Sequence, residues 1–280
     1  MKFAAECQIE IPGPDDWQAF QRLAAAEGWR VPEREPAWYQ QLGPGSAFVL
    51  RLEGVVIGLV SVMPYASSGW IGNLIVDHQY RGQGFGRRLF LQALDSLRWQ
   101  GLSRAWLTAS EQGQPLYLSC GFQPVTTVTR LAATGRGEQL VPGCPTPDEK
   151  LWRQLLELDR QVWGEDRCRY LNRLRDCSSV HRDGSSLLML QRHDGFCQIG
   201  PWYATEDSAV DLLPLVQQTL AQVPVGVEVV VDVPGSEWVR DLLRTAGFAS
   251  RGENSLMVAG GAGQLNRRRL LALASLGSAG

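Results

Sequence analysis

The apolar residues in the first half of the chain follow a helical period first and a β-strand period afterwards. Residues 15–29 carry apolar side chains at helical spacing, with Gly28 near the end, where a helix cap is expected. Residues 47–65 form two β-rich runs broken at Glu53–Gly54, a pattern typical of a hairpin. Residues 69–77 are apolar on both faces near their end and therefore predict a central, buried strand.

A glycine-rich stretch separates this strand from an amphipathic helix. Apolar positions from Leu89 to Leu97 form the stripe of that helix. The pattern continues with a strand at 104–110, a short helix that ends at Gly121 and a strand at 122–133. Short strands that alternate with helices predict an α/β fold.

The second half of the chain repeats this order. Residues 135–150 carry three glycines and three prolines, which predicts a domain boundary. The motifs around Gly72 and Gly121 recur around Gly200 and Gly247 at nearly the same distance along the chain. We therefore expect two related domains, residues 1–134 and 135–280. A single continuous sheet of unrelated parts is the alternative.

Composition narrows the classes of partner. The 280 residues have a net charge of −2 with acids and bases well mixed, which argues against a nucleic-acid partner held by bulk electrostatics. No apolar run approaches the roughly 20 residues that span a bilayer, and the N-terminus makes a poor signal peptide. We expect a soluble, cytoplasmic protein that does not bind membranes. Six cysteines without a CxxC pair favour reduced thiols and no metal site.

The stretch "YRGQGFGRR" has the composition of an anion-binding loop. Its glycines, Gly82, Gly84 and Gly86, let the backbone approach a phosphate without a Cβ in the way. The N–H groups at the start of the following helix then favour a negative charge, and neighbouring arginines add positive charge. The spacing fits neither the P-loop nor the dinucleotide-binding fingerprint. A glycine-rich turn without a ligand is the alternative.

Two motifs resemble those of the GNAT superfamily of N-acyltransferases. Arg81-x-x-Gly84-x-Gly86, with its lead-in "LIVDHQY", resembles the superfamily's acyl-CoA pyrophosphate loop, and "GQPLYLSCGF" resembles its later "A-x-x-L-Y-x-x-x-G-F" motif. The whole chain resembles bacterial two-domain members with a second, degenerate half. The resemblance implies tandem GNAT-like domains, each a mixed, mostly antiparallel sheet flanked by helices, with acetyl-CoA as cosubstrate.

The resemblance also implies roles for single residues. Ser110 is expected to reach the pantetheine, and Tyr117 to act on the thioester sulfur, where a hydroxyl can protonate the leaving thiolate. A tyrosine ring packed in the core is the alternative for Tyr117. The strand residues expected to pair with the pantetheine arm are Leu74, Ile75 and Val76. The residues expected to surround the pyrophosphate are Arg81, Gly82, Gln83, Gly84, Phe85, Gly86 and Arg87.

The acceptor and the base are less defined. We expect transfer of an acetyl group to a small primary amine by direct attack on the thioester. A non-catalytic acyl-CoA sensor and a protein N-acetyltransferase are the alternatives. An alkyl ammonium has a pKa of about 10, so a base should remove its proton. Asp77, Glu53 and Asp232 are candidates for that base, each with a structural alternative. The three histidines are expected at the surface, and the oligomeric state is left open.

The second half lacks the features that would bind CoA. No Arg-x-x-Gly-x-Gly occurs there, and acidic residues at 206, 207 and 211 would repel a pyrophosphate. Pro214 predicts a helix that is kinked or starts late, and Leu243 stands at the place of Tyr117. We expect this half to shape the acceptor cleft, with pure scaffolding as the alternative. The residues expected to line the cleft are Arg182, Trp202, Tyr203 and Asp232.

Overall fold

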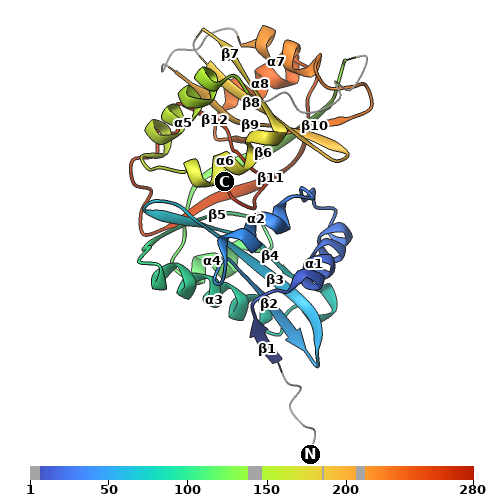
Figure 1. Cartoon of the computed structure of the whole chain (residues 1–280), viewed down its shortest axis with the longest axis vertical. Helices are drawn as coiled ribbons and strands as arrows, with labels where there is room; N and C mark the ends of the chain where they lie inside the picture. The colour runs from blue at the N-terminus through green and yellow to red at the C-terminus, as the bar shows by residue number, and fades with distance from the viewer. Residues whose placement is uncertain (1–6, 138–146, 185, 206–211) are drawn as a thin grey trace, which may run out of the picture. The chain divides into compact units, whose positions relative to one another are not determined.

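The computed structural model describes residues 7–137, 147–184, 186–205 and 212–280 (Figure 1). Contacts between residues divide the chain into two compact units. The first unit comprises Met1–Leu107 together with Gly277–Ala279, and the second comprises Thr108–Leu276 with Gly280.

The first unit is built on a sheet in which the strands follow one another in chain order. The strands are β1 (Cys7–Glu10), β2 (Ala47–Leu52), β3 (Val55–Pro64), β4 (Ser68–Val76) and β5 (Arg104–Ala109), of which β5 leads into the second unit. Neighbours are antiparallel except for β4 and β5, which are parallel. The hairpin at Glu53–Gly54 is confirmed, and both residues have positive φ, as a tight turn there requires.

Helices cover both faces of this sheet. The helix α3 (Phe85–Trp99) buries the predicted stripe from Leu89 to Leu97. Gly69 of β4 lacks a side chain at the point where Leu97 of α3 packs against the strand. The opposite face of β4 contacts α2 (Glu35–Leu42) through a hydrogen bond from Asn73 to Glu35. The helix α1 (Pro14–Ala26) also contacts β3 and β4, and the short helix η1 (His78–Tyr80) follows β4.

A β-bulge interrupts β4 at Asn73. Leu59 pairs with Ile75 and Ser61 pairs with Gly72, so β4 advances three residues while β3 advances two. Asn73 takes a left-handed φ of 54°, which is uncommon for a residue other than glycine. The extra residue changes which side chains face α3, because alternate residues of a strand point to opposite faces.

The strands of the second unit follow the order β11-β6-β10-β9-β8-β7, with β12 paired to β9. The strands are β6 (Gln123–Thr134), β7 (Ser178–Asp183), β8 (Ser186–His193), β9 (Phe196–Ala204), β10 (Glu228–Pro234), β11 (Ala249–Ala259) and β12 (Leu270–Ala272). The helices are α4 (Gln114–Ser119), α5 (Glu149–Trp163), α6 (Cys168–Leu174), η2 (Arg175–Cys177), α7 (Leu213–Leu220) and α8 (Glu237–Thr245).

The strand orders agree with the expected repeat. β7, β8 and β9 are antiparallel neighbours and β9 is parallel to β10, which reproduces the arrangement of β2, β3, β4 and β5. Pro214 lies in the first turn of α7, so this helix starts late, as predicted. β6 ends at the predicted boundary but pairs with β10 and β11, and for that reason it lies in the second unit. The boundary after residue 134 stays a prediction.

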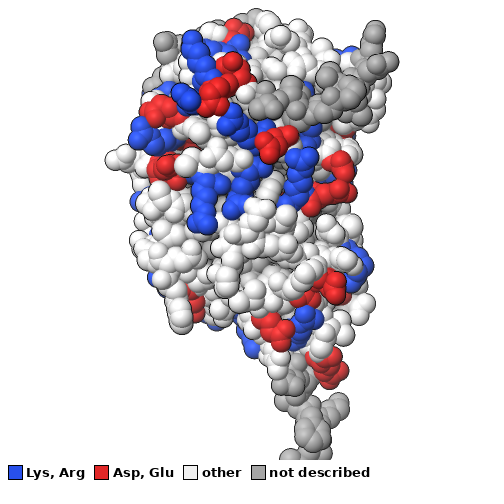
Figure 2. Space-filling view, in the orientation of Figure 1, with Lys and Arg blue, Asp and Glu red and all other residues white. Residues whose placement is uncertain are grey.

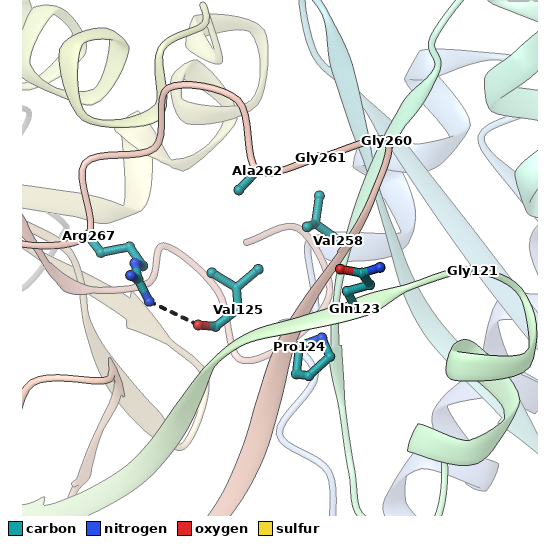
Figure 3. A pocket seen from close by; sticks show the side chains of 9 residues that line it. All are labelled: Gly121, Gln123, Pro124, Val125, Val258, Gly260, Gly261, Ala262 and Arg267. Atoms are coloured by element: carbon teal, nitrogen blue, oxygen red, sulfur yellow. Dashed lines mark hydrogen bonds between the residues drawn. The ribbon is translucent and has the colours of Figure 1, made fainter.

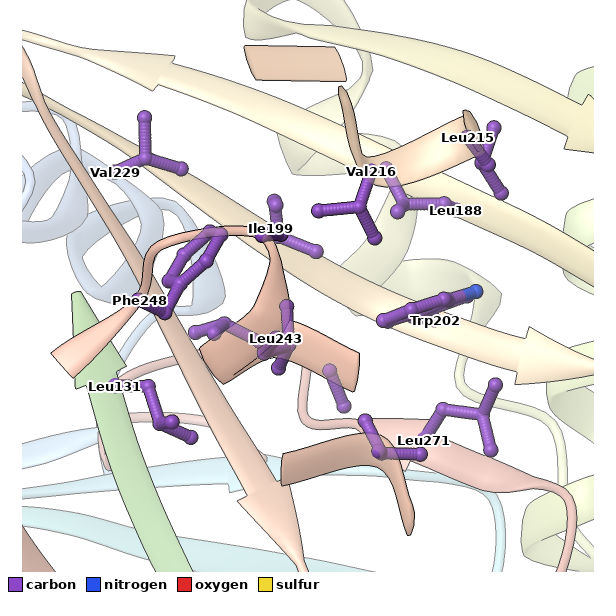
Figure 4. Close-up of a cluster of buried hydrophobic side chains, with 14 of the residues drawn as sticks. Leu131, Leu188, Ile199, Trp202, Leu215, Val216, Val229, Leu243, Phe248 and Leu271 are labelled. Atoms are coloured by element: carbon purple, nitrogen blue, oxygen red, sulfur yellow. The ribbon is translucent and has the colours of Figure 1, made fainter. Parts of the chain in front are cut away.

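The core of the second unit is an apolar cluster between β9, β10 and the helices α7 and α8. Figure 4 shows Trp202, Val216 and Leu243 within this cluster, each fully buried. Leu243 occupies the position expected for a second Tyr117, and its burial gives it a packing role. Among the described residues, no helix is long and apolar enough to cross a membrane.

Candidate functional site

The glycine loop joins the end of β4 to the start of α3. Asp77 follows β4 and accepts a hydrogen bond from the backbone N–H of Gln79, at 3.0 Å. Gly82 and Gly84 have φ values of 76° and 82°, which a side chain would strain. Gly84 caps α3 without a side-chain bond, so the first N–H groups of α3 point into the loop without a helical acceptor. This arrangement suits an anion.

The arginines of the loop differ in their availability. Arg81 donates from Nε to the carbonyl of Val76 at 2.9 Å and pairs through Nη2 with Glu27 at 2.6 Å. The guanidinium group therefore bonds the loop to the end of β4 and to Glu27, the residue after α1. Arg87 and Arg88 are exposed at the start of α3, and Arg88 also donates to the carbonyl of Cys7. The exposed backbone of residues 82–84 and Arg87 remain open to a ligand.

The edge of β4 next to β5 is only partly paired. Ser68–Trp70 pair with Arg104–Trp106, and the ladder given by the described residues ends there. Leu74, Ile75 and Val76 lie beyond that point, just before the glycine loop. Unpaired backbone groups on a strand edge are a template for an extended ligand. The predicted strand and loop residues therefore lie next to one another in the first unit.

Beside the bulge, a buried polar cluster lies on the face of β4 that contacts α2. Asn73 donates from Nδ2 to Glu35 Oε1 at 2.5 Å and to Ser61 Oγ at 3.1 Å. The Glu35 side chain is 1% exposed. Burial raises the pKa of Glu35 to about 7, against the opposing effect of hydrogen bonds from Asn73 and the Ser278 hydroxyl. No carboxylate of this kind was among the predicted bases.

The segment Gly277–Ala279 covers this cluster within the first unit. Tyr39 donates to the carbonyl of Ser278 at 2.9 Å, Trp70 donates to that of Gly277 at 3.0 Å, and Tyr65 donates to that of Ala279. Gly72 permits the approach, because a Cβ there would lie 2.3 Å from the Ser278 carbonyl oxygen. This part of the chain is therefore packed against the rest of the first unit.

Ser110 and Tyr117 belong to the second unit, whereas the other predicted site residues belong to the first. Ser110 Oγ accepts a hydrogen bond from the N–H of Gly113 at 3.2 Å and starts the turn into α4. The Tyr117 ring lies against Phe122, with centroids 6.3 Å apart. Burial raises the pKa of Tyr117 to about 12, so its hydroxyl keeps its proton at neutral pH. A group in this state donates hydrogen bonds.

The three predicted bases all have structural partners or exposed positions. Asp77 caps η1, and Glu53 is exposed in the hairpin. Asp232 is 1% exposed and is bound by Arg130 through two bonds of 2.8 and 2.7 Å, so its charge is already neutralised.

The histidines only partly follow the expectation of surface positions. His78 is exposed, whereas His181 and His193 are half-buried. Burial and, to a lesser extent, the charge of Arg192 lower the pKa of His181 to about 4, so it is neutral at pH 7.

In the second unit, β12 occupies the cleft between β9 and β10. The parallel pairing of β9 and β10 ends at Ile199 and Val231. Beyond it, β12 pairs with Trp202 and Tyr203 of β9, and the N–H of Leu273 donates to the carbonyl of Asp232 at 3.0 Å. A Cβ at Gly200 would meet the carbonyl oxygen of Leu273. The chain itself therefore fills the position that corresponds to the unpaired edge of β4.

Three of the four residues expected to line an acceptor cleft lie in the core. Trp202, Tyr203 and Asp232 are at most 1% exposed, so the expectation was wrong for them. Tyr203 bonds to Asp159, which forms a buried ion pair with Arg167. The sequence gave no indication that β12 covers Trp202, Tyr203 and Asp232. The acidic residues at 206, 207 and 211 lie outside the described residues.

The fourth, Arg182, is exposed and lines a hollow of about 430 Å³ in the second unit. Arg153, Glu157 and Arg269 also line it. Figure 2 shows acidic and basic side chains interspersed on one face of the molecule. Ion pairs such as Arg153–Glu149 and Arg160–Glu157 join such side chains on the second unit. This mixture of charges does not form a strip for a polyanion.

A pocket of about 500 Å³ opens between β6, β11 and the loop that follows β11. Figure 3 shows Arg267 at one side of the pocket, where Nη1 donates to the carbonyl of Val125 at 3.0 Å. Gly121, the glycine of the predicted "GQPLYLSCGF" motif, lines the same pocket. Five cysteines of the described ranges are free thiols, and those ranges contain no group of three or more His, Cys, Asp or Glu arranged for a metal ion.

Comparison with known proteins agrees with this geometry. Residues 15–122 match the model of the Acetyltransferase (GNAT) family. Over the whole chain, the fold is similar to that of a candidate acetyltransferase from Pyrococcus horikoshii, with a TM-score of 0.80 and 18% identity, covering 100% of this chain and 98% of that one. A GCN5-related N-acetyltransferase from Sphaerobacter thermophilus has a TM-score of 0.64 and 18% identity, covering 90% and 95%.

A curated relative matches a shorter stretch. A UPF0039 protein from Schizosaccharomyces pombe is 42% identical over 55 residues, which are 19% of this chain and 37% of that protein. The match thus spans little more than a third of the length of this relative. At 18% identity, the structural neighbours show a shared fold.

Proposed function

We propose that the protein is a GNAT acetyltransferase that transfers an acetyl group from acetyl-CoA to a small primary amine, as the match of residues 15–122 to the GNAT family model supports. One observation carries the proposal. The pairing of β4 with β5 ends at Trp70, and the unpaired part of β4 leads into the glycine loop and the start of α3. A phosphate-binding helix start and an unpaired strand edge suit the two ends of a CoA molecule.

In this proposal the end of β4 and the glycine loop, both in the first unit, bind most of the cofactor. Backbone groups of Leu74, Ile75 and Val76 pair with the pantetheine arm, and Ser110 adds a hydroxyl. The N–H groups from Gly82 to Arg87 hold the pyrophosphate, with Gln83 and Phe85 supplying backbone. Arg81 keeps the loop in shape through its bonds to Val76 and Glu27, and Arg87 contributes charge.

The reaction then proceeds by direct attack of the amine on the thioester carbon. The tetrahedral intermediate collapses with loss of a thiolate, which Tyr117 protonates. Because the pKa of the Tyr117 phenol is raised to about 12, its hydroxyl is protonated at neutral pH and can donate a hydrogen bond to the leaving sulfur. Residues 1–134 form the catalytic domain in this scheme, and residues 135–280 shape the acceptor site without binding CoA.

A small acceptor is favoured over a protein by the mixed surface charge, which offers no extended patch of one sign on the face shown in Figure 2. The match of residues 15–122 to the acetyltransferase family supports an acceptor of the amine class. The protein termini of other chains are the second acceptor class, and a peptide panel beside the amine panel separates the two.

Gly86 offers a sharp test of cofactor binding. A Cβ at Gly86 would meet only Val76 Cγ2 at 3.8 Å, an ordinary contact, so Gly86→Ala should keep the fold and bind acetyl-CoA. Gly86→Asp adds a carboxylate in the first turn of α3, where it stabilises a helix but repels a pyrophosphate. We expect at least a tenfold loss of acetyl-CoA affinity for Gly86→Asp in calorimetry, with an unchanged melting temperature of the free protein.

Two results would count against the proposal. If the wild-type protein neither binds acetyl-CoA nor gains melting temperature from it, the cofactor site is not where we propose. If it binds acetyl-CoA but no amine or peptide of a broad panel releases free thiol, the protein is a sensor of acyl-CoA rather than an enzyme.

A further inference from the structure

Glu35 is an acidic side chain whose position calls for an explanation. Burying a carboxyl group opposes its ionisation, and proteins rarely bury one without a cationic partner. Glu35 is 1% exposed, and its hydrogen-bond partners are the amide of Asn73 and the hydroxyl of Ser278, both uncharged. An apolar residue would pack there without this cost.

Glu35 lies beside the part of β4 where the proposed function places the reaction centre. Asn73 is the residue of the β4 bulge, and its left-handed φ of 54° is a strained conformation of the kind that clusters at functional sites. The bulge lies between Trp70, where the pairing with β5 ends, and Leu74, where the proposed pantetheine contacts begin. In the proposed function, the thioester lies along this part of β4.

The Ser278 hydroxyl connects the buried carboxyl group with the outside. Ser278 is half-buried, in contrast to Glu35, and its hydroxyl bonds to the Glu35 carboxylate. The segment that carries it is fixed by Tyr39 and Trp70, which donate to the carbonyls of Ser278 and Gly277. A hydroxyl held in this way can pass a proton, because it both donates and accepts.

We propose that Glu35 accepts the proton of the acceptor ammonium, relayed through the hydroxyl of Ser278. This inference rests on the proposed function. The ammonium gives a proton to Ser278 Oγ while the Ser278 hydroxyl proton passes to Glu35, so Ser278 ends unchanged and Glu35 becomes neutral.

The free amine then forms its C–N bond at the thioester carbon, and the C–S bond breaks. Tyr117 protonates the thiolate. The second proton of the attacking nitrogen restores the Tyr117 hydroxyl, and Glu35 releases its proton to solvent.

The side chains that affect the pKa of Glu35 are uncharged. From β4 it faces Asn73, and from the segment Gly277–Ala279 it faces Ser278. Ser61 of β3 bonds to Asn73, and the phenols of Tyr39 and Tyr65 bond to backbone carbonyls. Among the described residues, no charged side chain contributes to the pKa of Glu35, which is about 7. Activity should therefore rise with pH through this value, because the relay needs an ionised carboxylate.

The test uses thiol release from acetyl-CoA with the amine that the wild-type protein uses best. We expect Glu35→Gln to lower kcat/KM by about 100-fold and to abolish the rise of kcat/KM with pH near 7. Ser278→Ala removes a hydrogen bond that favours ionised Glu35. It should lower kcat/KM by about tenfold and move the rise to higher pH. The matched control is Glu33→Gln, an exposed residue in the turn before α2, which should change neither quantity.

Each outcome bears on the inference. Unchanged pH profiles in both variants would overturn it. A melting temperature that falls in proportion to activity would also overturn it, because Glu35 and Ser278 would then serve only the stability of the fold. A wild-type protein without turnover contradicts the proposed function and this inference together. Turnover that survives Glu35→Gln with its pH dependence intact contradicts the inference alone.

Discussion

Glu35 makes the stability of the protein depend on pH, whatever its part in catalysis. Its pKa is about 7 in the folded protein, against an ordinary value of 4.5. Between these values the folded state holds a proton that the unfolded state has released. The stabilisation is therefore complete below pH 4.5 and is lost as the pH rises through 7. Since one pKa unit corresponds to about 1.4 kcal/mol, the loss should amount to about 3 kcal/mol.

Glu35→Gln should remove this dependence, because glutamine does not ionise. Urea unfolding at pH 4.5 and pH 8 measures it, and the variant should gain about 3 kcal/mol relative to the wild-type protein between the two values. Equal pH dependence of the two proteins would show that the folded and unfolded states share one pKa for Glu35.

Single residues also show what the sequence could predict. The glycines of the loop were recognisable, because only glycine takes the φ values of Gly82 and Gly84 without strain. The bond of Arg81 to Glu27 was not recognisable, because Glu27, which follows α1, is distant in the sequence. Glu35 was not predicted for the same reason, since Ser278, which covers it, lies near the other end of the chain.

At the scale of elements, a buried ion pair holds α5 against the rest of the second unit. Asp159 of α5 and Arg167 are both 1% exposed and are joined at 2.7 Å, with Tyr203 of β9 bonded to the same carboxylate. Asp159→Ala would leave the Arg167 charge buried without its partner, which costs about 3–5 kcal/mol. Denaturant unfolding at pH 7 should show this loss.

The exposed pair Glu157–Arg160 on the same helix is the matched control. Glu157→Ala should leave the unfolding midpoint unchanged, because an exposed ion pair contributes little in water. A loss for Asp159→Ala no larger than that of the control would mean that water reaches Arg167 and replaces the carboxylate.

Elements with a strong period were predictable, and those defined by distant contacts were not. β4 and α3 followed from their apolar patterns, because each buries a continuous face. The helix α2 was missed, since eight residues with a proline in the first turn give too short a pattern. The pairing of β12 with β9 could not be read from "LLA", because a short apolar run suits a strand or a helix equally.

At the scale of the whole molecule, the repeat predicts how many cofactors bind. The first unit leaves the edge of β4 unpaired beyond Trp70, whereas β12 fills the corresponding edge of β9. The second unit also lacks a glycine loop with the pattern of Arg81 to Gly86 and carries Leu243 in the place of Tyr117. A ligand would have to displace β12, whose three residues are buried. One CoA site per chain is therefore expected.

Calorimetry with acetyl-CoA should give a stoichiometry of one per chain for the wild-type protein. Gly86→Asp should remove that binding without leaving a second, weaker phase. The control is Gly235→Ala, in the loop after β10 that corresponds to the turn into α4, which alters only the second unit. It should lower stability, because its φ of 67° strains a side chain, but keep one acetyl-CoA per chain. A stoichiometry of two, or a residual site in Gly86→Asp, would show that the second unit has kept a cofactor site despite β12.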